Sequence, residues 1–103
     1  MNIIKLSTVL SFIFIHPVLF AKGNAELGKQ KSVTCIACHG ANGISNNPIW
    51  PNLAGQKAQY LIKQMKDFRS GARKEASMSP MAKPLTDADI ENLAAYYSSL
   101  KCK

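Results

Sequence analysis

The sequence predicts an all-α fold, and three observations lead to that prediction. Residues 57–70 and 86–100 each repeat apolar side chains at the three- and four-residue spacing of an amphipathic helix. No segment of useful length alternates apolar and polar residues with the period of a β-strand. The chain is also short, at 103 residues, which allows one small domain. We therefore expect a few helices joined by loops.

The N-terminus has the pattern of a secretory signal. Lys5 precedes an apolar run over residues 6–20, and Ala21 then offers the small residue at which a signal peptidase cuts. Cleavage after Ala25 is the alternative. A histidine-proline pair interrupts the run, which is also short for a bilayer span, so a retained membrane anchor is the less favoured reading. Residues 1–21 are therefore expected to be a signal peptide.

Residues 22–103 are then expected to form one exported domain located in the periplasm. A domain of this size buries a limited apolar core by itself, so a large cofactor would help to complete it. The chain carries 13 Lys and Arg against 6 Asp and Glu, but no basic-aromatic module accompanies the charge, which argues against nucleic-acid binding. Six cations gather in one segment, where they form either a solvated helix face or a surface that steers an acidic protein partner. They are Lys57, Lys63, Lys66, Arg69, Arg73 and Lys74.

Three helices can be placed in the domain. The first is expected to begin at the N-cap Asn24 and to run into residues 35–39, with Gly28 inside it. A helical glycine costs about 1 kcal/mol relative to alanine, so a close packing contact is expected at Gly28. The second is expected over residues 57–70, ended by Gly71, and the third after the N-cap Thr86 with acidic residues in its first turn. The apolar stripes are Leu61, Met65 and Phe68 in the second helix, and Ile90, Leu93, Tyr96 or Tyr97, and Leu100 in the third.

Residues 35–39 form the most specific motif, Cys35-Ile36-Ala37-Cys38-His39. Two cysteines three residues apart lie on one face of a helical turn, so both thiols can add to the vinyl groups on one side of a porphyrin. The C-x-x-C-H pattern is typical of c-type haem attachment, and His39 would then lie beneath the iron as its proximal ligand. The sequence therefore predicts one covalent haem c, bound through Cys35 and Cys38.

Two other readings of the cysteine motif are weaker. A thioredoxin-like C-x-x-C would follow a strand in a βαβ unit, and no such strand pattern precedes it here. Zinc has four candidate ligands in Cys35, Cys38, His39 and Cys102. However, zinc motifs space their ligand pairs differently, and the adjacent Cys38 and His39 would have difficulty reaching one tetrahedral ion.

The candidates for the sixth iron ligand are the methionines of the domain. His39 is the only histidine after the expected signal peptide, so a second histidine from the same domain is excluded. Met65 lies on the apolar stripe of the second helix, where core packing explains it. Met78 and Met81 lie in a serine- and proline-containing segment, read as a loop that can wrap over a haem face. Histidine-methionine ligation raises the reduction potential and closes the iron to substrates, which favours electron transfer.

These motifs together resemble the class I cytochromes c of bacteria, in the subgroup called c-four and c-five types. The resemblance covers nearly all of residues 22–103. A tryptophan at Trp50 and a cysteine at Cys102 depart from the family pattern without altering the ligand set. The matching stretches are Gly28, residues 35–40, the Pro51-Asn52-Leu53-Ala54-Gly55-Gln56 segment, Tyr60-Leu61, Gln64-Met65, the Met78 segment, Leu85-Thr86-Asp87, and Leu93-Ala94-Ala95-Tyr96.

The resemblance implies a small cytochrome c fold, with helices and loops wrapped around one covalent haem. It implies that the first and last helices cross where Gly28 meets Tyr96. It also implies that the carbonyl of Pro51 accepts the imidazole N–H of His39, which would fix the tautomer of the proximal ligand. The axial methionine of the family falls on Met78.

The expected function is one-electron transfer without enzymatic activity. The resemblance implies redox protein partners, such as a cytochrome reductase and a terminal oxidase of a respiratory chain, and contact with the membrane only through them. The haem subunit of a larger membrane oxidoreductase, and a small peroxidase or gas sensor with a labile methionine, are the alternatives. Cys102 is left over once the haem is attached, so a disulfide-linked dimer through Cys102 is also expected in part of the population.

Overall fold

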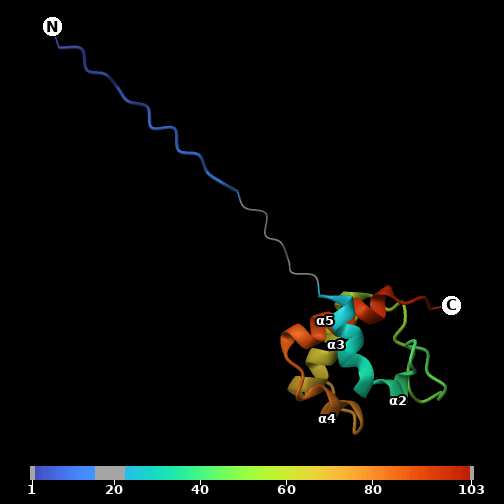
Figure 1. The fold of residues 1–103 in the computed structure, drawn as a ribbon. Helices are drawn as coiled ribbons and strands as arrows, with labels where there is room; N and C mark the ends of the chain where they lie inside the picture. Colours follow the sequence, from blue (N-terminus) through green and yellow to red (C-terminus); the bar gives the residue numbers. More distant parts are fainter. Residues whose placement is uncertain (1, 16–22, 103) are drawn as a thin grey trace.

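The computed structural model describes residues 2–15 and 23–102, and these residues form helices and loops without a β-strand (Figure 1). The predicted all-α class is therefore confirmed. The elements in chain order are α1 (Ala25–Lys31), the 3-10 helix η1 (Ser32–Thr34), α2 (Ile36–His39), α3 (Ala58–Ser70), α4 (Met78–Ala82) and α5 (Asp87–Ser99).

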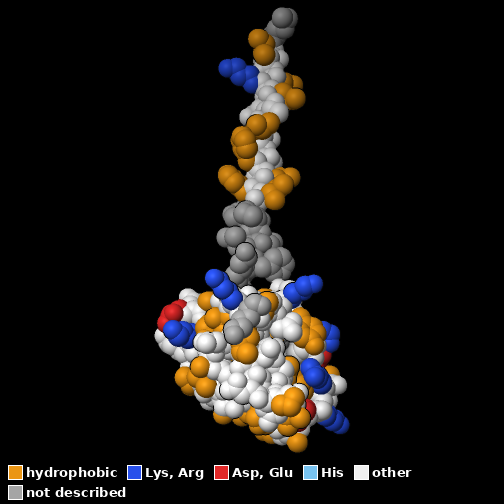
Figure 2. All heavy atoms as spheres, turned by 90° about the vertical axis from the view of Figure 1, so that its right-hand side faces the viewer, with side chains coloured by type: hydrophobic (Ala, Val, Ile, Leu, Met, Phe, Trp, Pro, Cys, Tyr) orange, Lys and Arg blue, Asp and Glu red, His pale blue; other side chains and the backbone are white. Residues whose placement is uncertain are grey.

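Residues 2–15 form neither helix nor strand, and their side chains are exposed. Figure 2 shows the apolar side chains of this segment projecting along an extended trace. The expected cleavage position after Ala21 lies outside the described residues, as does residue 103. Within the described ranges, no helix has both the length and the apolar character needed to cross a bilayer.

The helix boundaries follow from local capping. The Asn24 side chain accepts a hydrogen bond from the Leu27 N–H at 3.0 Å, so Asn24 caps α1 as predicted. Lys57 precedes α3 in extended conformation, and Gly71 ends it at φ 87°, a left-handed conformation that glycine adopts without a Cβ penalty. Both ends of α3 therefore agree with the sequence to within one residue.

Helix α5 begins with a complete capping box. The Thr86 hydroxyl accepts from the Asp89 N–H, and the Asp89 carboxylate accepts from the Thr86 N–H, each at 3.0 Å. Two backbone donors that the first turn leaves without helical partners are thereby satisfied.

Helix α5 packs most extensively against α1 and next against α3. At the crossing with α1, a Cβ at Gly28 would overlap the Asn92 carbonyl oxygen and would lie 2.8 Å from the Tyr96 Cβ. The close approach of α5 therefore explains why a glycine, despite its low helix propensity, stands at this position of α1. The Asn92 side chain adds a second link, because its oxygen accepts from the Asn24 N–H at 2.8 Å. The first and last helices are thus joined by both packing and hydrogen bonding (Figure 1).

The segment between α3 and α5 differs from the prediction. Residues 78–82 were expected to lie in a loop, but they form the short helix α4, which packs on α3. Ala82 of this helix is fully buried. Periodicity could not reveal this helix, because five residues make fewer than two turns and Pro80 falls at the third position.

The apolar core lies mainly between α3 and α5. Of the two tyrosines that the periodicity left open, Tyr97 is the buried one, at 3% exposure, and Tyr96 is half-buried beside Gly28. Leu100 follows α5 as its C-cap and packs on the core from its edge. The buried apolar residues are Ala54, Leu61, Phe68, Ala82, Ile90, Leu93, Ala94 and Tyr97.

Candidate functional site

The two thiols and the imidazole of the motif are held on one helical turn. Cys35 follows η1 and is the N-cap of α2, whose last residue is His39. The Cys35 carbonyl accepts from the His39 N–H at 2.9 Å, which closes the turn. Gly40 then leaves the helix at φ 82°, a left-handed conformation. Cys35 and Cys38 are free, half-buried thiols in this turn, and the arrangement is the one that attachment to two neighbouring vinyl groups requires.

His39 is 5% exposed, and a backbone carbonyl orients its ring. The Nδ1 atom lies 2.8 Å from the Pro51 carbonyl oxygen, so the protonated Nδ1 donates to that oxygen. Nε2 is then left unprotonated with its lone pair available to a metal. A histidine held in this way is a stronger and better-oriented ligand than a free one.

The surroundings of Cys35 fit a large bound group. The Tyr97 hydroxyl is buried and lacks a hydrogen-bond partner among the described residues. Burial raises the pKa of Tyr97, and the neighbouring Cys35 thiol adds to the rise. Cys35 itself packs at the edge of the core cluster around Leu61 and Leu93. The Ser32 and Cys35 side chains lie beside this hydroxyl, but neither meets it with hydrogen-bond geometry, so a bound group at the site could satisfy it.

The residues Cys35, Cys38 and His39, together with the Pro51 carbonyl, could therefore hold a haem. The covalent bonds would be thioethers to the two cysteines, and the iron bond would come from His39 Nε2. One porphyrin with one iron is what this single motif accommodates, so the cofactor is one covalent haem c.

The methionines differ in their positions. Met78 is the first residue of α4 and is half-buried, whereas Met81 in the same helix is 42% exposed. Met65 is half-buried and packs on the core cluster from α3, as its place on the apolar stripe predicted. Figure 1 draws α2 and α4, the helix that begins with Met78, at the same lower end of the domain.

A depression of about 240 Å³ lies beside the cysteine motif. Trp50, which departs from the family pattern, forms part of its wall. The other lining residues are Ile36, Ala37, Cys38, Gly40, Asn46 and Asn47. Trp50 is only half-buried, and the position thus adds an aromatic side chain to the border of the site without contributing a ligand.

Two side chains hold the backbone on either side of α4: Glu75, which the sequence did not single out, and Arg69, which was expected only to contribute to the basic segment. The carboxylate of Glu75 accepts from the Met78 N–H at 2.7 Å, and the Arg69 guanidinium donates to the Leu85 carbonyl at 3.0 Å. Arg69 also pairs with Asp87 at 2.6 Å and lowers the pKa of that carboxyl. Glu75 stands two positions before the N-cap Ser77, outside the positions that the usual capping patterns use, so its role could not be predicted from the sequence.

Comparisons with known proteins agree with this site. The cytochrome c family profile matches residues 25–101. The chain is 51% identical over 80 residues to cytochrome c-554(548) of Halomonas halodenitrificans, a match covering 75% of this chain and 96% of the relative. It is 41% identical over 110 residues to cytochrome c4 of Stutzerimonas stutzeri, covering 98% of this chain and 52% of the relative.

Solved structures show the same relationship. The crystal structure of reduced recombinant cytochrome c4 from Pseudomonas stutzeri superimposes with a TM-score of 0.73 at 44% identity, over 77% of this chain and 46% of that chain. The chain thus spans about half the length of the cytochrome c4 proteins that it matches. The helical fold, the C-x-x-C-H turn and the profile match lead to one conclusion: this chain belongs to the cytochrome c family and is an electron carrier with one covalent haem c.

Proposed function

We propose that this protein is a periplasmic one-electron carrier whose haem iron is ligated by His39 and Met78. The observation that supports it most strongly is the 2.8 Å contact between His39 Nδ1 and the Pro51 carbonyl, which leaves Nε2 for the iron. We further propose that residues 1–21 direct export and that residues 22–103 are the mature domain. Its partners would be redox proteins of a respiratory chain, such as a cytochrome reductase and a terminal oxidase.

The chain's own residues favour fast and reversible electron transfer. The haem supplies a one-electron change at its iron when bound. The Pro51 carbonyl fixes the ring orientation of His39, and a rigid histidine needs little rearrangement between oxidation states. Burial of His39 at 5% exposure keeps water from its ring. A methionine at the opposite face would raise the reduction potential and leave no open position for a substrate.

Met78 is the better candidate for that methionine on two grounds. It is half-buried at the beginning of α4, whereas Met81 on the same helix is exposed, at 42%. The N–H of Met78 is also anchored by the Glu75 carboxylate, so its backbone position is defined. The family pattern independently assigns the axial ligand to Met78.

Visible spectroscopy of the purified holoprotein tests this assignment. Wild type should be low-spin with a methionine-to-iron charge-transfer band in the ferric state. Met78→Ala should keep the covalent haem, lose that band and lower the reduction potential, because methionine ligation raises it. Met81→Ala is the matched control and should retain both properties.

The same spectra discriminate the alternatives. The reverse pattern in the two variants would assign the ligand to Met81. A high-spin wild-type spectrum would favour a small peroxidase or gas sensor, and co-purification with membrane proteins would favour a subunit of a larger oxidoreductase.

A further inference from the structure

We propose that Glu75 is the positioning residue that keeps Met78 on the haem iron. This inference rests on the proposed ligation by Met78, and it concerns a side chain that lies outside the ligand set and the cysteine motif. Glu75 stands three positions before Met78, in the connection between α3 and α4.

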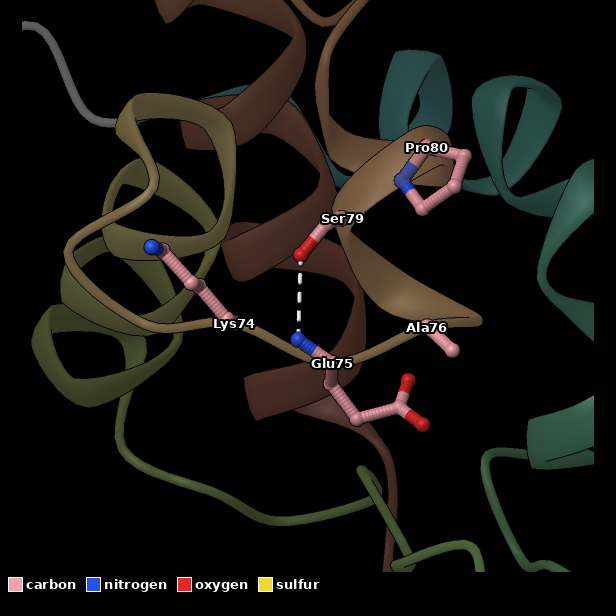
Figure 3. A pocket seen from close by; sticks show the side chains of 5 residues that line it. All are labelled: Lys74, Glu75, Ala76, Ser79 and Pro80. Atoms are coloured by element: carbon pink, nitrogen blue, oxygen red, sulfur yellow. Dashed lines mark hydrogen bonds between the residues drawn. The ribbon is translucent and has the colours of Figure 1, made fainter.

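The contacts of Glu75 converge on the beginning of α4. Its Oε2 atom accepts from the Ser77 N–H at 2.8 Å and from the Met78 N–H at 2.7 Å. Its own backbone N–H donates to the Ser79 hydroxyl at 3.1 Å, the bond drawn in Figure 3. The Glu75 carbonyl accepts from the Ser79 N–H at 2.9 Å. Glu75 therefore binds the segment 77–79 through its side chain, its N–H and its carbonyl.

These bonds replace a cap that the sequence does not otherwise supply. Ser77, the N-cap of α4, makes no side-chain capping bond. A five-residue helix gains little from its own backbone bonds, because helix formation in so short a segment is unfavourable without outside support. The carboxylate of Glu75 is thus the polar group that fixes the first turn, and the first turn carries Met78.

Apolar packing anchors the other end of α4 but not this end. Ala82 is fully buried, whereas Ala76, Ser77 and Pro80 are exposed. Figure 3 shows the Glu75 and Ala76 side chains at the border of an open depression rather than beneath other elements. The Met78 side chain is itself half-buried, but the residues before it are exposed, so the hydrogen bonds to Glu75 are what fix its backbone.

The connection before Glu75 is fixed as well, which makes Glu75 a defined anchor. The Arg73 guanidinium donates to the Gln64 side chain at 2.6 Å and lies 4.5 Å from the centre of the Phe68 ring. The Arg73 N–H donates to the Asp67 carbonyl at 3.0 Å. The backbone just before Glu75 is therefore held against α3. The Glu75 carboxylate in turn binds the Met78 N–H, so Met78 is linked to α3 through Glu75.

Competition between Met78 and added imidazole tests the proposal. Imidazole binds ferric iron only where the methionine has left it, so its apparent affinity reports the fraction of detached methionine. Glu75→Ala removes two charge-assisted hydrogen bonds at an exposed position, and the imidazole affinity should rise about three- to tenfold. Glu75→Gln keeps an acceptor oxygen and should give a smaller rise. Each titration follows loss of the methionine charge-transfer band in purified ferric holoprotein.

Glu26→Ala is the matched control, because Glu26 is an exposed acidic residue in the first turn of α1 and far along the chain from Met78. It should leave the imidazole affinity at the wild-type value. Global unfolding in denaturant, followed by helix content, should shift equally little in Glu26→Ala and Glu75→Gln. A general loss of stability would instead lower both the band and the helix content together.

The outcomes separate this proposal from the ligand assignment. Retention of the charge-transfer band in Met78→Ala would overturn the assignment and the proposal together. If Met78→Ala does lose the band, wild-type imidazole affinity in both Glu75 variants would overturn the proposal alone. Should Glu75→Ala fail to accumulate, Glu75→Gln and Ser79→Ala decide the question, since both are expected to raise the affinity.

Discussion

Single side chains fix the two ends of the site by different means. His39 is held by one backbone carbonyl, that of Pro51, within a buried turn. The beginning of α4 is held by the exposed carboxylate of Glu75. Hydrogen bonds at exposed positions are more easily exchanged for water than buried ones, so the histidine side of the site is expected to be the more rigid of the two.

The third cysteine gives a prediction at this scale. Cys102 is an exposed thiol, and a Cβ at Gly55 would lie 3.1 Å from its Sγ. With Cys35 and Cys38 bound to haem, no cysteine in the described ranges remains to pair with it, and the proposed export would bring it into oxidising conditions. We expect part of the population to carry an intermolecular or mixed disulfide, visible as a slower band on non-reducing gels.

Cys102→Ser is the control and should give only the monomer band. A single monomer mass for wild type under air, with one thiol that alkylates freely, would rule the disulfide out and leave Cys102 as an inert residue over Gly55.

Individual elements show which local rules the chain follows. The N-caps Asn24 and Thr86 and the C-terminal Gly71 lie where the sequence placed them, because caps depend on the chemistry of one or two neighbouring residues. Helix α4 does not follow from its own sequence, since Glu75 and the buried Ala82 stabilise it from outside the periodic pattern. In the candidate site too, one part could be predicted from local sequence and the other could not.

The motif at residues 35–39 can be recognised in the sequence, because covalent attachment of haem requires a fixed spacing of the cysteines and the histidine. The hydrogen-bond partners of Met78 cannot, because they depend on how the chain folds around it. Asn92 illustrates the same limit. Its side chain joins α5 to Asn24, 68 positions earlier in the sequence, and no local sequence pattern predicts a hydrogen bond over that separation. The crossing at Gly28 was expected only because a helical glycine and a family resemblance pointed to it.

The crossing of α1 and α5 predicts the effect of adding one methyl group. Gly28→Ala should gain about 1 kcal/mol in helix propensity but lose more from overpacking, typically about 1–3 kcal/mol, because the new Cβ overlaps the Asn92 carbonyl. The net result should be a lower midpoint of thermal unfolding of the holoprotein. Gln30→Ala, at an exposed position of the same helix, controls for propensity and should be neutral or slightly stabilising. A stabilised Gly28→Ala would contradict the close crossing.

The capping box of α5 predicts a dependence on pH. The hydrogen bond from the Thr86 N–H lowers the pKa of Asp89, and Lys31 at 3.4 Å contributes further. A carboxyl whose pKa is lower in the folded state stabilises it above the unfolded value of about 3.9, and this contribution is lost as the pH falls through the lowered pKa. Asp89→Asn should therefore be less stable than wild type near neutral pH, with the difference shrinking in acid.

Denaturant unfolding of the holoprotein at about pH 7 and about pH 3 measures this difference. Glu91→Gln removes a charge from the same helix without touching the capping box, and it serves as control. An Asp89→Asn difference that stays constant between the two pH values would contradict the assigned role.

The molecule as a whole carries a positive charge of +7, and the structure divides the basic segment into two groups. Lys63 pairs with Asp67, Arg69 with Asp87, and Arg73 binds Gln64. In the part of the chain that the structure describes, Lys57, Lys66 and Lys74 form no ion pair, and of these three Lys57 and Lys74 are exposed. Figure 2 shows Lys and Arg side chains projecting around one face of the domain, where few acidic ones interrupt them. The unpaired lysines are those available to an acidic partner.

Electron transfer to an acidic redox protein should therefore slow as salt shortens the screening length from roughly 30 Å to 8 Å. The double variant Lys57→Gln/Lys74→Gln should show a smaller salt dependence of the second-order rate constant in stopped-flow measurements. The matched pair Lys29→Gln/Lys101→Gln, also exposed, should keep the wild-type slope. Flat wild-type kinetics would leave the basic segment as a solvated surface.

The union of α1 with α5 also constrains the order of folding. The core closes only when the last helix meets the first, and contacts between distant parts of a chain form slowly because a long loop must close before they stabilise anything. The cysteine motif follows α1 and η1, so its thiols precede α5 by more than half the length of the domain. Cys35 packs against a cluster that includes Leu93, Ala94 and Tyr97 of α5, so we expect both thiols to stay accessible for haem attachment until α5 docks. A fold that joins its two ends last therefore provides the interval in which a cofactor can be built into its interior.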